Sequence, residues 1–326
     1  FIGQYNYSMR LFIILLCFLT LLSCSKEDTK MALLISGEGR MSKVRGFEEG
    51  LRALGVKNIK LDVYVGDNNL KKLEEKAIEV INKLDEYKLI AVGGSIEAYY
   101  LKKLKPDMKK PVVIMGGTAV KAWGLTDSMS RPTYNITGVD NLNAELMEKR
   151  MEIFHRIFPH IKKVVVFCTP QFEASKLATR ITVKAGEKYG IRVVPVSVRD
   201  ALDLEYVISH MKEDGFGGII ITPCFYTENF LTSYILQYAN FYQVPVMCLS
   251  PEQAKGGCPV SYGSSGYEQG YQAAFIAYRL LKGEQVKDVP FEKVRNIKLV
   301  INQKALRELG IPYDPQIISL ADQVLR

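Results

Sequence analysis

Metal-binding and catalytic patterns are scarce in this sequence. Its 326 residues include three histidines, six cysteines and one tryptophan, and no Cys-x-x-Cys or Cys/His spacing typical of zinc occurs. A Gly-x-Ser-x-Gly segment is also absent, and no histidine follows a predicted strand where it could act as a base. We therefore expect no metal and no catalytic residues, and we interpret the chain as a binding protein rather than an enzyme.

Two further classes of partner lack their usual signals. Gly37-x-Gly39 follows the first predicted strand, but Ser42 replaces the third glycine of a dinucleotide site, and we expect no cofactor. The formal net charge is only +8, and the basic stretch KKLKPDMKK at 102–110 has no interleaved aromatic residues. Such a charge run is typical of a solvated loop, so we expect no nucleic-acid partner.

Long apolar runs are absent except for LFIILLCFLTLL at 11–22, which follows Arg10. The run is too short to span a bilayer but suits a secretory signal. It ends in Leu-Leu-Ser-Cys, which resembles a bacterial lipobox, and Met9 is the expected start. We predict a signal peptide at 1–23, lipidation of Cys24 and a tether at 24–30. The protein is then expected to be an extracytoplasmic, membrane-anchored lipoprotein.

Four cysteines remain after the predicted signal peptide and the lipidated residue. They are Cys168, Cys224, Cys248 and Cys258. An exported chain can oxidise such residues to a disulfide, but a core of this size does not need one. The sequence leaves their pairing open.

Strand and helix patterns alternate along the rest of the chain. Predicted strands MALLIS, IKLDVYV, LIAVGG and PVVIMGG precede a polar stretch, and KKVVVFC, IRVVPVSV, GGIIITP and VPVMCLS follow it. This alternation predicts two doubly wound α/β lobes with parallel sheets. The last sixty residues are too few for a third domain, so we expect them to complete both lobes. The predicted lobes are 31–138 plus 266–290 and 139–265 plus 291–326, joined by a hinge.

Glycine-rich turns and polar residues follow the predicted strands in both halves. Ligands of open α/β sheets bind at these carboxyl ends, where backbone N–H groups are accessible. The turn Gly94–Ser95 begins a predicted helix and can receive a carboxylate. Other candidate ligand-binding residues at such strand ends are Ser36, Thr118, Thr169 and Gln171.

Acidic and aromatic residues occur in the same loops. The glutamates available for a ligand ammonium are Glu38, Glu173 or Glu252, and the residues expected to line an apolar pocket are Phe172, Phe225 and Tyr226. Trp123, Glu228 and the Tyr99–Tyr100 pair are further loop residues of these types. We predict a zwitterionic amino acid or similar carboxylate as ligand, with an apolar or aromatic side chain.

Four segments resemble one known family. They are Asn135-Ile-Thr-Gly-Val139, GYEQGYQAAFIAYRLLKGEQVKDVPFEK, LVINQKALRELGI and SLADQVL. They resemble the ABC-transporter substrate-binding family, in the branch that includes tryptophan- and phenylalanine-binding lipoproteins. The resemblance implies a type I periplasmic-binding fold. The family's Gly-x-Pro at the third strand end corresponds to Gly94–Ile96 here, which adds Ile96 to the candidates.

We predict a monomer whose lobes close on the ligand and which presents its closed form to an ABC permease and its ATPase. Two other functions stay open at this point. The same binding protein could serve a sensor or chemoreceptor, and the chain could be an exported α/β hydrolase.

Overall fold

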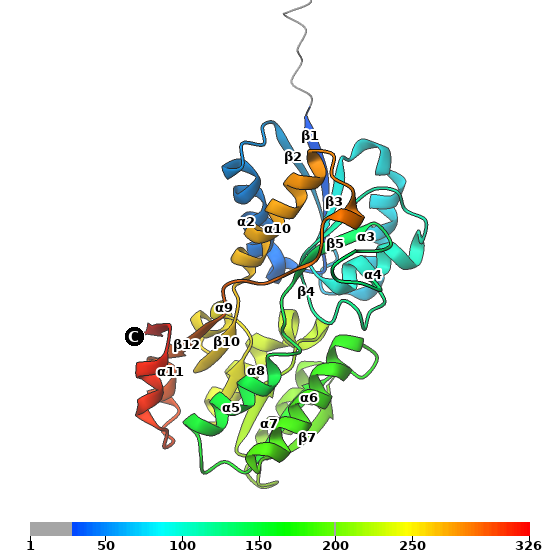
Figure 1. Cartoon of the computed structure of the whole chain (residues 1–326). Helices are drawn as coiled ribbons and strands as arrows, with labels where there is room; N and C mark the ends of the chain where they lie inside the picture. Colours follow the sequence, from blue (N-terminus) through cyan, green and yellow to red (C-terminus); the bar gives the residue numbers. More distant parts are fainter. Residues whose placement is uncertain (1–27, 199) are drawn as a thin grey trace, which may run out of the picture.

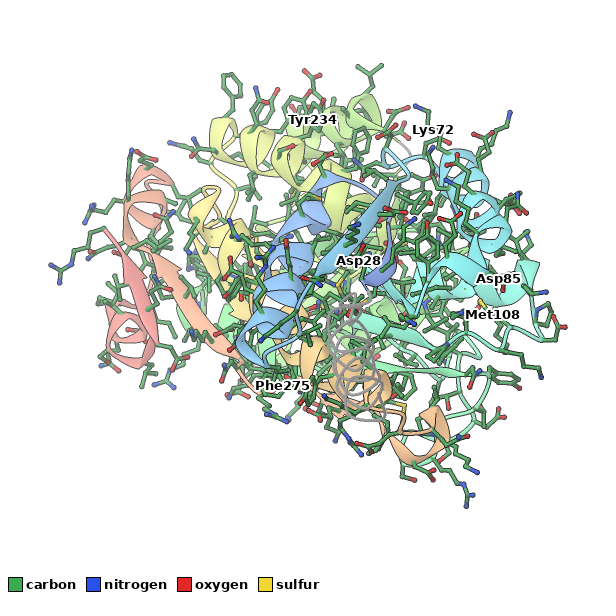
Figure 2. The ribbon with its side chains drawn as sticks, turned by 90° about the horizontal axis from the view of Figure 1, so that it is seen from above. Asp28, Lys72, Asp85, Met108, Tyr234 and Phe275 are labelled. Atoms are coloured by element: carbon green, nitrogen blue, oxygen red, sulfur yellow. A yellow bond between two sulfur atoms is a disulfide. The ribbon has the colours of Figure 1, made fainter. Side chains whose placement is uncertain are left out.

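Two α/β lobes make up the described part of the chain, each built around its own sheet (Figure 1). The structure is a computed structural model that describes residues 28–198 and 200–326. The expected signal peptide and Cys24 lie outside the described residues. Figure 2 looks down on the first lobe, with Asp28 near the middle of the view, where the described chain begins.

The first lobe has a parallel sheet of six strands among the described residues, in the order β11-β5-β4-β3-β1-β2. Its strands are β1 (Thr29–Ile35), β2 (Ile59–Val65), β3 (Leu89–Val92), β4 (Val112–Gly117), β5 (Ile136–Asp140) and β11 (Glu292–Lys293). Its helices are η1 (Glu38–Arg40), α2 (Met41–Ala53), α3 (Leu70–Asn82), η2 (Leu84–Glu86), α4 (Ser95–Leu104), α10 (Gly266–Leu281) and η4 (Val286–Asp288).

Strand β1 shows why this sheet is covered on both faces. Leu33 and its alternate neighbours pack with α2 and α10, whereas Leu34 packs with α3 and α4. Successive side chains of a strand point to opposite faces, so a continuous apolar run such as MALLI needs two covering layers. The helices supply both layers, and the strand ends lie between them at one edge.

The second lobe has a mostly parallel sheet of seven strands in the described part of the chain, ordered β13-β12-β10-β9-β8-β6-β7, with β12 antiparallel to β10. Its strands are β6 (Lys163–Cys168), β7 (Arg192–Ser197), β8 (Gly218–Ile221), β9 (Val246–Cys248), β10 (Val260–Gly263), β12 (Lys298–Asn302) and β13 (Gln323–Leu325). Its helices are α5 (Met147–Ile157), α6 (Glu173–Tyr189), α7 (Ala201–His210), η3 (Thr227–Leu231), α8 (Thr232–Phe241), α9 (Pro251–Lys255), α11 (Gln303–Glu308) and η5 (Pro315–Leu320).

Helix α5 is a feature that the strand and helix patterns did not predict. Its sequence MEKRMEIFHRI buries Met151 and Phe154 against the second sheet. Its apolar positions recur at helical spacing, but the polar stretch before it obscures where the helix begins. The helix therefore adds a covering element to the second lobe.

The chain passes between the sheets three times within the described residues, after β5, after β10 and after β11 (Figure 1). The first lobe was predicted to end at 138 and 290, but its strands extend beyond both positions. Strand β5 continues to Asp140, and it pairs with β11 at Glu292↔Val139 and Lys293↔Asp140. Gly138 therefore lies inside the first sheet. Its φ is +151°, and a Cβ there would lie 2.4 Å from the Ile114 oxygen.

Arg150 connects two of these crossings. Its Nη1 donates to the backbone oxygen of Asn143 and its Nη2 to Asn143 Oδ1, both at 2.6 Å. Its Nε donates to the backbone oxygen of Tyr262 at 2.8 Å. The side chain is fully buried, and burial lowers the pKa of Arg150 to about 9. One buried guanidinium thus fixes the segment after β5 against the end of β10.

Candidate functional site: two cavities between the lobes

A small cavity lies between the carboxyl ends of the two sheets. Both lobes contribute to it, which is the position expected for a ligand of a two-lobed α/β protein. We call it the aromatic cavity. It is lined by Arg40, Gly94, Ser95, Ile96, Gly116, Thr118, Trp123, Asn141, Phe172, Ala174, Pro223, Cys224, Phe225 and Glu228.

The beginning of helix α4 forms the polar end of this cavity. Ser95 Oγ donates to the Thr118 oxygen at 2.8 Å, and Thr118 Oγ1 donates to Asn141 Oδ1 at 2.9 Å. A Cβ at Gly94 would lie 2.7 Å from Arg40 Nη1, so a side chain at this position would displace the guanidinium. The backbone N–H groups of a helix start and a cation together favour an anion such as a carboxylate.

Arg40 is held in place by buried partners. Its Nε lies 3.0 Å from Glu97 Oε1 and donates to Ser36 Oγ at 2.8 Å, and its Nη1 donates to the Gly93 oxygen at 2.9 Å. No partner of Nη2 is found among the described residues, and Arg40 lines the cavity. The guanidinium can therefore offer Nη2 to a ligand without leaving its ion pair.

Aromatic side chains from both lobes form the other end. The ring of Phe172 lies 6.0 Å from Trp123 and 6.0 Å from Phe225, measured between ring centroids. Phe172 and Phe225 belong to the second lobe but pack into a core cluster of the first. The Trp123 Nε1 atom is buried without a hydrogen-bond partner in the structure. These rings provide an apolar surface for a planar ligand group.

A second cavity adjoins the first and shares Arg40 and Glu228 with it. We call it the polar cavity. Its further lining residues are Gly39, Ser42, Lys43, Asn143, Leu249, Ser250, Glu252, Gln253, Ser264, Gly266 and Gln269. Lys43 is buried and donates to the oxygens of Gly93 at 2.8 Å and Gly116 at 2.9 Å. Burial, with the nearby Arg40 charge, lowers the pKa of Lys43 to about 7.

The structure brings seven of the predicted site residues to the two cavities. Gly94, Ser95, Ile96, Thr118, Phe172 and Phe225 line the aromatic cavity, and Glu252 lines the polar cavity. The other six do not line either one. Those six are Ser36, Glu38, Thr169, Gln171, Glu173 and Tyr226.

These six have identifiable alternative roles or surroundings. Ser36 positions Arg40, and the amide N–H of Thr169 donates to Ser175 Oγ, so both stabilise loops behind the cavities. The Glu173 carboxylate binds Lys176 at 2.6 Å on the surface. The Tyr226 ring packs against Phe172 and Phe225, and the Glu38 and Gln171 residues are exposed to solvent.

Several lining residues were not among the sequence candidates. Arg40 and Lys43 come directly after the first glycine-rich turn and are three residues apart in the sequence. Their closeness to that turn could have marked both as candidate ligand-binding residues. Asn141 lies just after β5, where no strand end was expected. Gln269 comes from α10, which returns to the first lobe late in the chain, and only the fold places it at the cavity.

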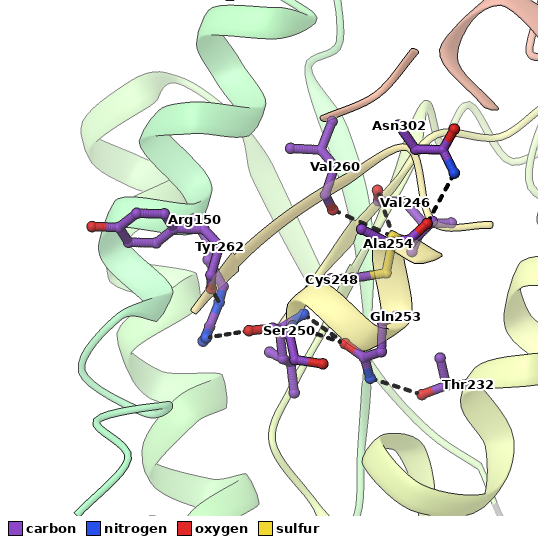
Figure 3. Close-up of a disulfide and its surroundings, with 12 residues drawn as sticks. Arg150, Thr232, Val246, Cys248, Ser250, Gln253, Ala254, Val260, Tyr262 and Asn302 are labelled. Carbon is purple, nitrogen blue, oxygen red and sulfur yellow. Dashed lines mark hydrogen bonds between the residues drawn. A yellow bond between two sulfur atoms is a disulfide. The ribbon is translucent and has the colours of Figure 1, made fainter. Parts of the chain in front are cut away.

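Cys248 and Cys258 form a disulfide beside α9 (Figure 3). Cys168 and Cys224 are free thiols. The disulfide closes the β9–α9–β10 segment that carries Glu252. Gln253 Oε1 accepts from the Leu249 amide at 2.7 Å, and its Nε2 donates to Thr232 Oγ1 at 3.2 Å. Within residues 28–198 and 200–326, no group of three or more His, Cys, Asp or Glu side chains is placed to hold a metal ion.

The family model described as "ABC transporter substrate binding protein" matches residues 29–325. The chain belongs to this family. The resemblance found in the sequence is thereby confirmed, and so is the interpretation as a substrate-binding protein rather than an enzyme. Substrate-binding proteins of ABC transporters are extracytoplasmic. No helix of the described chain is long and apolar enough to cross a membrane.

Known relatives and solved structures agree with this assignment. A tyrosine-binding protein of Clostridioides difficile strain R20291 is 23% identical over 274 residues, covering 82% of this chain and 76% of that protein. An ABC domain from Streptococcus pneumonia, in complex with L-Trp, has a TM-score of 0.82 at 18% identity, covering 92% and 100% of the two chains. A Vibrio cholerae conserved domain protein has a TM-score of 0.82 at 20% identity, covering 91% and 100%. The predicted two-lobed fold is confirmed.

Proposed function

We propose that this protein binds an aromatic amino acid between its lobes and delivers it to an ABC permease and its ATPase. The observation that carries the proposal is the aromatic cavity, where rings from both lobes face a polar helix start across one space. A cavity with one apolar and one polar end suits a molecule of the same two-part character.

The polar end suits the ligand's carboxylate. Ser95 and Ile96 begin α4, and the Arg40 guanidinium lies beside Gly94. A buried carboxylate needs its charge met by several donors, and backbone amides with a guanidinium supply them. A neutral sugar has no carboxylate to accept from these donors.

The other end suits an aromatic side chain. Trp123 and Phe172 lie on opposite lobes, so a ligand ring that packs against both of them would contact both lobes and favour the closed arrangement. Two relatives support the same ligand class, since one is named for tyrosine and the other was solved with L-Trp.

Delivery to a permease is proposed to occur at the outer face of a membrane, where lipidated Cys24 anchors a monomer. The support for the anchor is the apolar run at 11–22 followed by Leu-Leu-Ser-Cys and a polar stretch. Closure of the lobes around the ligand then gives the permease one surface to recognise.

Binding can be measured through the chain's only tryptophan, which is Trp123. Titration with L-phenylalanine or L-tyrosine should change its fluorescence in a saturable way, whereas L-leucine, L-glutamate and a neutral sugar should not. Calorimetry with all twenty amino acids, including L-tryptophan, then ranks the ligands. Saturable binding of a sugar with no response to any amino acid would refute the proposal.

A pair of variants controls this experiment. Phe172→Leu removes a ring from the cavity and should weaken aromatic binding at least about tenfold, because a ring contact and its buried area are lost. Phe216→Leu changes a partly buried ring that packs against the second-lobe core away from both cavities and should leave affinity unchanged.

A further inference from the structure

The amino ends of the first-lobe strands gather at one edge of their sheet, at the opposite end from the cavities (Figure 1). The strands are parallel, so the segments that lead into them lie side by side. The Thr29 amide donates to the Asn58 oxygen at 2.9 Å, and the Val112 amide donates to the Asn135 oxygen at 2.9 Å. We call this part of the first lobe the amino edge.

The described chain also begins at the amino edge. Figure 2 looks toward this end of the lobe, with Asp28 near the middle of the view. Cys24, the predicted site of lipidation, precedes Asp28 by four residues in the sequence. Four residues of extended chain span at most about 14 Å. An acyl anchor at Cys24 therefore holds the amino edge close to the membrane surface, with the cavities on the far side of the lobe.

Lysine side chains are concentrated in the segments at this edge. Lys57 precedes β2, Lys109 and Lys110 precede β4, and Lys282 follows α10. Asn135 Nδ2 donates to the Lys109 oxygen at 2.6 Å, which fixes that loop beside β5. All four lysines are exposed or partly exposed, and none forms an ion pair with an acidic side chain of the described chain. Their positive charge is therefore directed to solvent.

The acidic residues of the amino edge do not neutralise these four lysines, because most of them are paired with other lysines. The ion pairs are Asp28 with Lys60, Asp107 with Lys105, and both Glu86 and Asp62 with Lys30. Asp85 is exposed and forms no ion pair among the described residues. Lysines thus outnumber acidic residues at the amino edge, and the surplus charge is positive.

The basic stretch at 102–110 contributes only its second half to this surface. Lys102 donates to the Gly124 oxygen, and Lys103 lies 3.1 Å from Glu74, so both are used within the lobe. Lys109 and Lys110 have no such partner. The stretch was expected to be a solvated loop, and the fold places its free lysines on the same edge as the start of the described chain.

We propose that the amino edge is a membrane-docking surface that binds anionic lipid headgroups around the predicted anchor. The attraction of a lysine to an anionic bilayer falls off within a Debye length, so only side chains held close to the membrane contribute. The nearness of the membrane rests on the proposed anchor at Cys24, whereas the lipid preference of the lysines does not. Docking in this orientation keeps the cavities turned away from the lipid.

The test measures how the exported protein binds to lipid vesicles. All measurements use the chain with Cys24→Ala, which removes the predicted acylation site and any binding through acyl chains. Sedimentation compares vesicles of neutral phosphatidylcholine with vesicles that also contain about 30 mol% phosphatidylglycerol. The protein should bind the anionic vesicles at least about tenfold more tightly, and about 0.5 M salt should remove the difference. Equal binding to both kinds of vesicle would overturn the inference.

A triple variant tests whether the amino edge causes this preference. Lys57→Gln, Lys109→Gln and Lys110→Gln together should weaken binding to the anionic vesicles at least about tenfold, because each lysine near the surface adds to the attraction. Binding to neutral vesicles should not change. Binding of the parent protein to a soluble polyanion such as heparin, without binding to either vesicle, would assign the lysines to another partner and overturn the membrane surface.

A second triple variant is the matched control. Lys162→Gln, Lys184→Gln and Lys212→Gln remove the same charge from exposed positions of the second lobe and should leave vesicle binding nearly unchanged. If both triple variants weaken it equally, net charge alone is responsible and the inference fails.

Amino-acid binding separates this inference from the proposed function. Titration with L-phenylalanine, followed by Trp123 fluorescence, should give the same affinity in both triple variants, which also shows that both are folded. Retained amino-acid binding without a preference for anionic vesicles overturns the docking surface alone. A preference for anionic vesicles without amino-acid binding refutes the proposed ligand and supports the docking surface.

Discussion

Arg40 Nε lies 3.0 Å from Glu97 Oε1, and both side chains are buried at the edge of the aromatic cavity. Removing one partner of a buried ion pair leaves a charge without compensation. Glu97→Gln should therefore lower the free energy of unfolding by about 3 kcal/mol, measured by chemical denaturation.

The double variant Arg40→Met with Glu97→Met gives a matched control for this ion pair. Replacing both charges by apolar groups should restore most of the stability that Glu97→Gln loses. It should still weaken amino-acid binding, because the guanidinium beside α4 is gone. A double variant as unstable as the single one would contradict the role assigned to the pair.

Asp140 should make stability depend on pH. Burial raises its pKa to about 6 from 3.8, and the nearby Glu145 charge acts in the same direction, whereas the Leu142 amide and Lys293 oppose it. The folded state therefore holds this proton more tightly. Its contribution to stability is complete below pH 3.8 and is lost as the pH rises through about 6.

Asp140→Asn removes this titration but keeps an oxygen for the Leu142 amide. The variant should gain stability over the unaltered protein as the pH rises, by at most about 3 kcal/mol at neutral pH. Denaturation at a series of pH values measures the difference. A difference that does not change between pH 3.8 and neutrality would contradict the assignment to Asp140.

The Cys248–Cys258 disulfide should stabilise the second lobe. It closes a short loop, ten residues apart in sequence, and its loss should cost about 2 to 3 kcal/mol. The melting temperature of the unaltered protein should fall on reduction, whereas a variant with both residues changed to alanine should melt low and ignore the reductant. Cys168→Ala, which removes a free thiol, should keep the response.

Cys24→Ala should move the protein from the membrane fraction to the soluble exported fraction. Stable anchoring depends on acyl chains carried by the predicted lipobox cysteine. Fractionation followed by immunoblotting measures the change, with Cys17→Ala as the control that should keep the protein on the membrane. Membrane retention of the Cys24 variant equal to that of the unaltered protein would refute lipidation at this residue.

The sequence alone determined the two-lobed α/β fold, because apolar runs such as MALLI can be buried only between two helical layers. It also located the α4 start at Gly94–Ser95 and the aromatic loops, since strand ends in such folds carry the site. The family segments in the last third of the chain agreed with the two lobes that the strand and helix alternation predicts.

Only the tertiary structure decided which distant residues meet. Gln269 reaches the polar cavity because α10 packs on α2, and Phe172 meets Trp123 because the lobes face each other. The pairing of Cys248 with Cys258 depends on β9 lying beside β10. Local patterns determine each element, but contacts between elements depend on how the two sheets are completed by segments far apart in the chain.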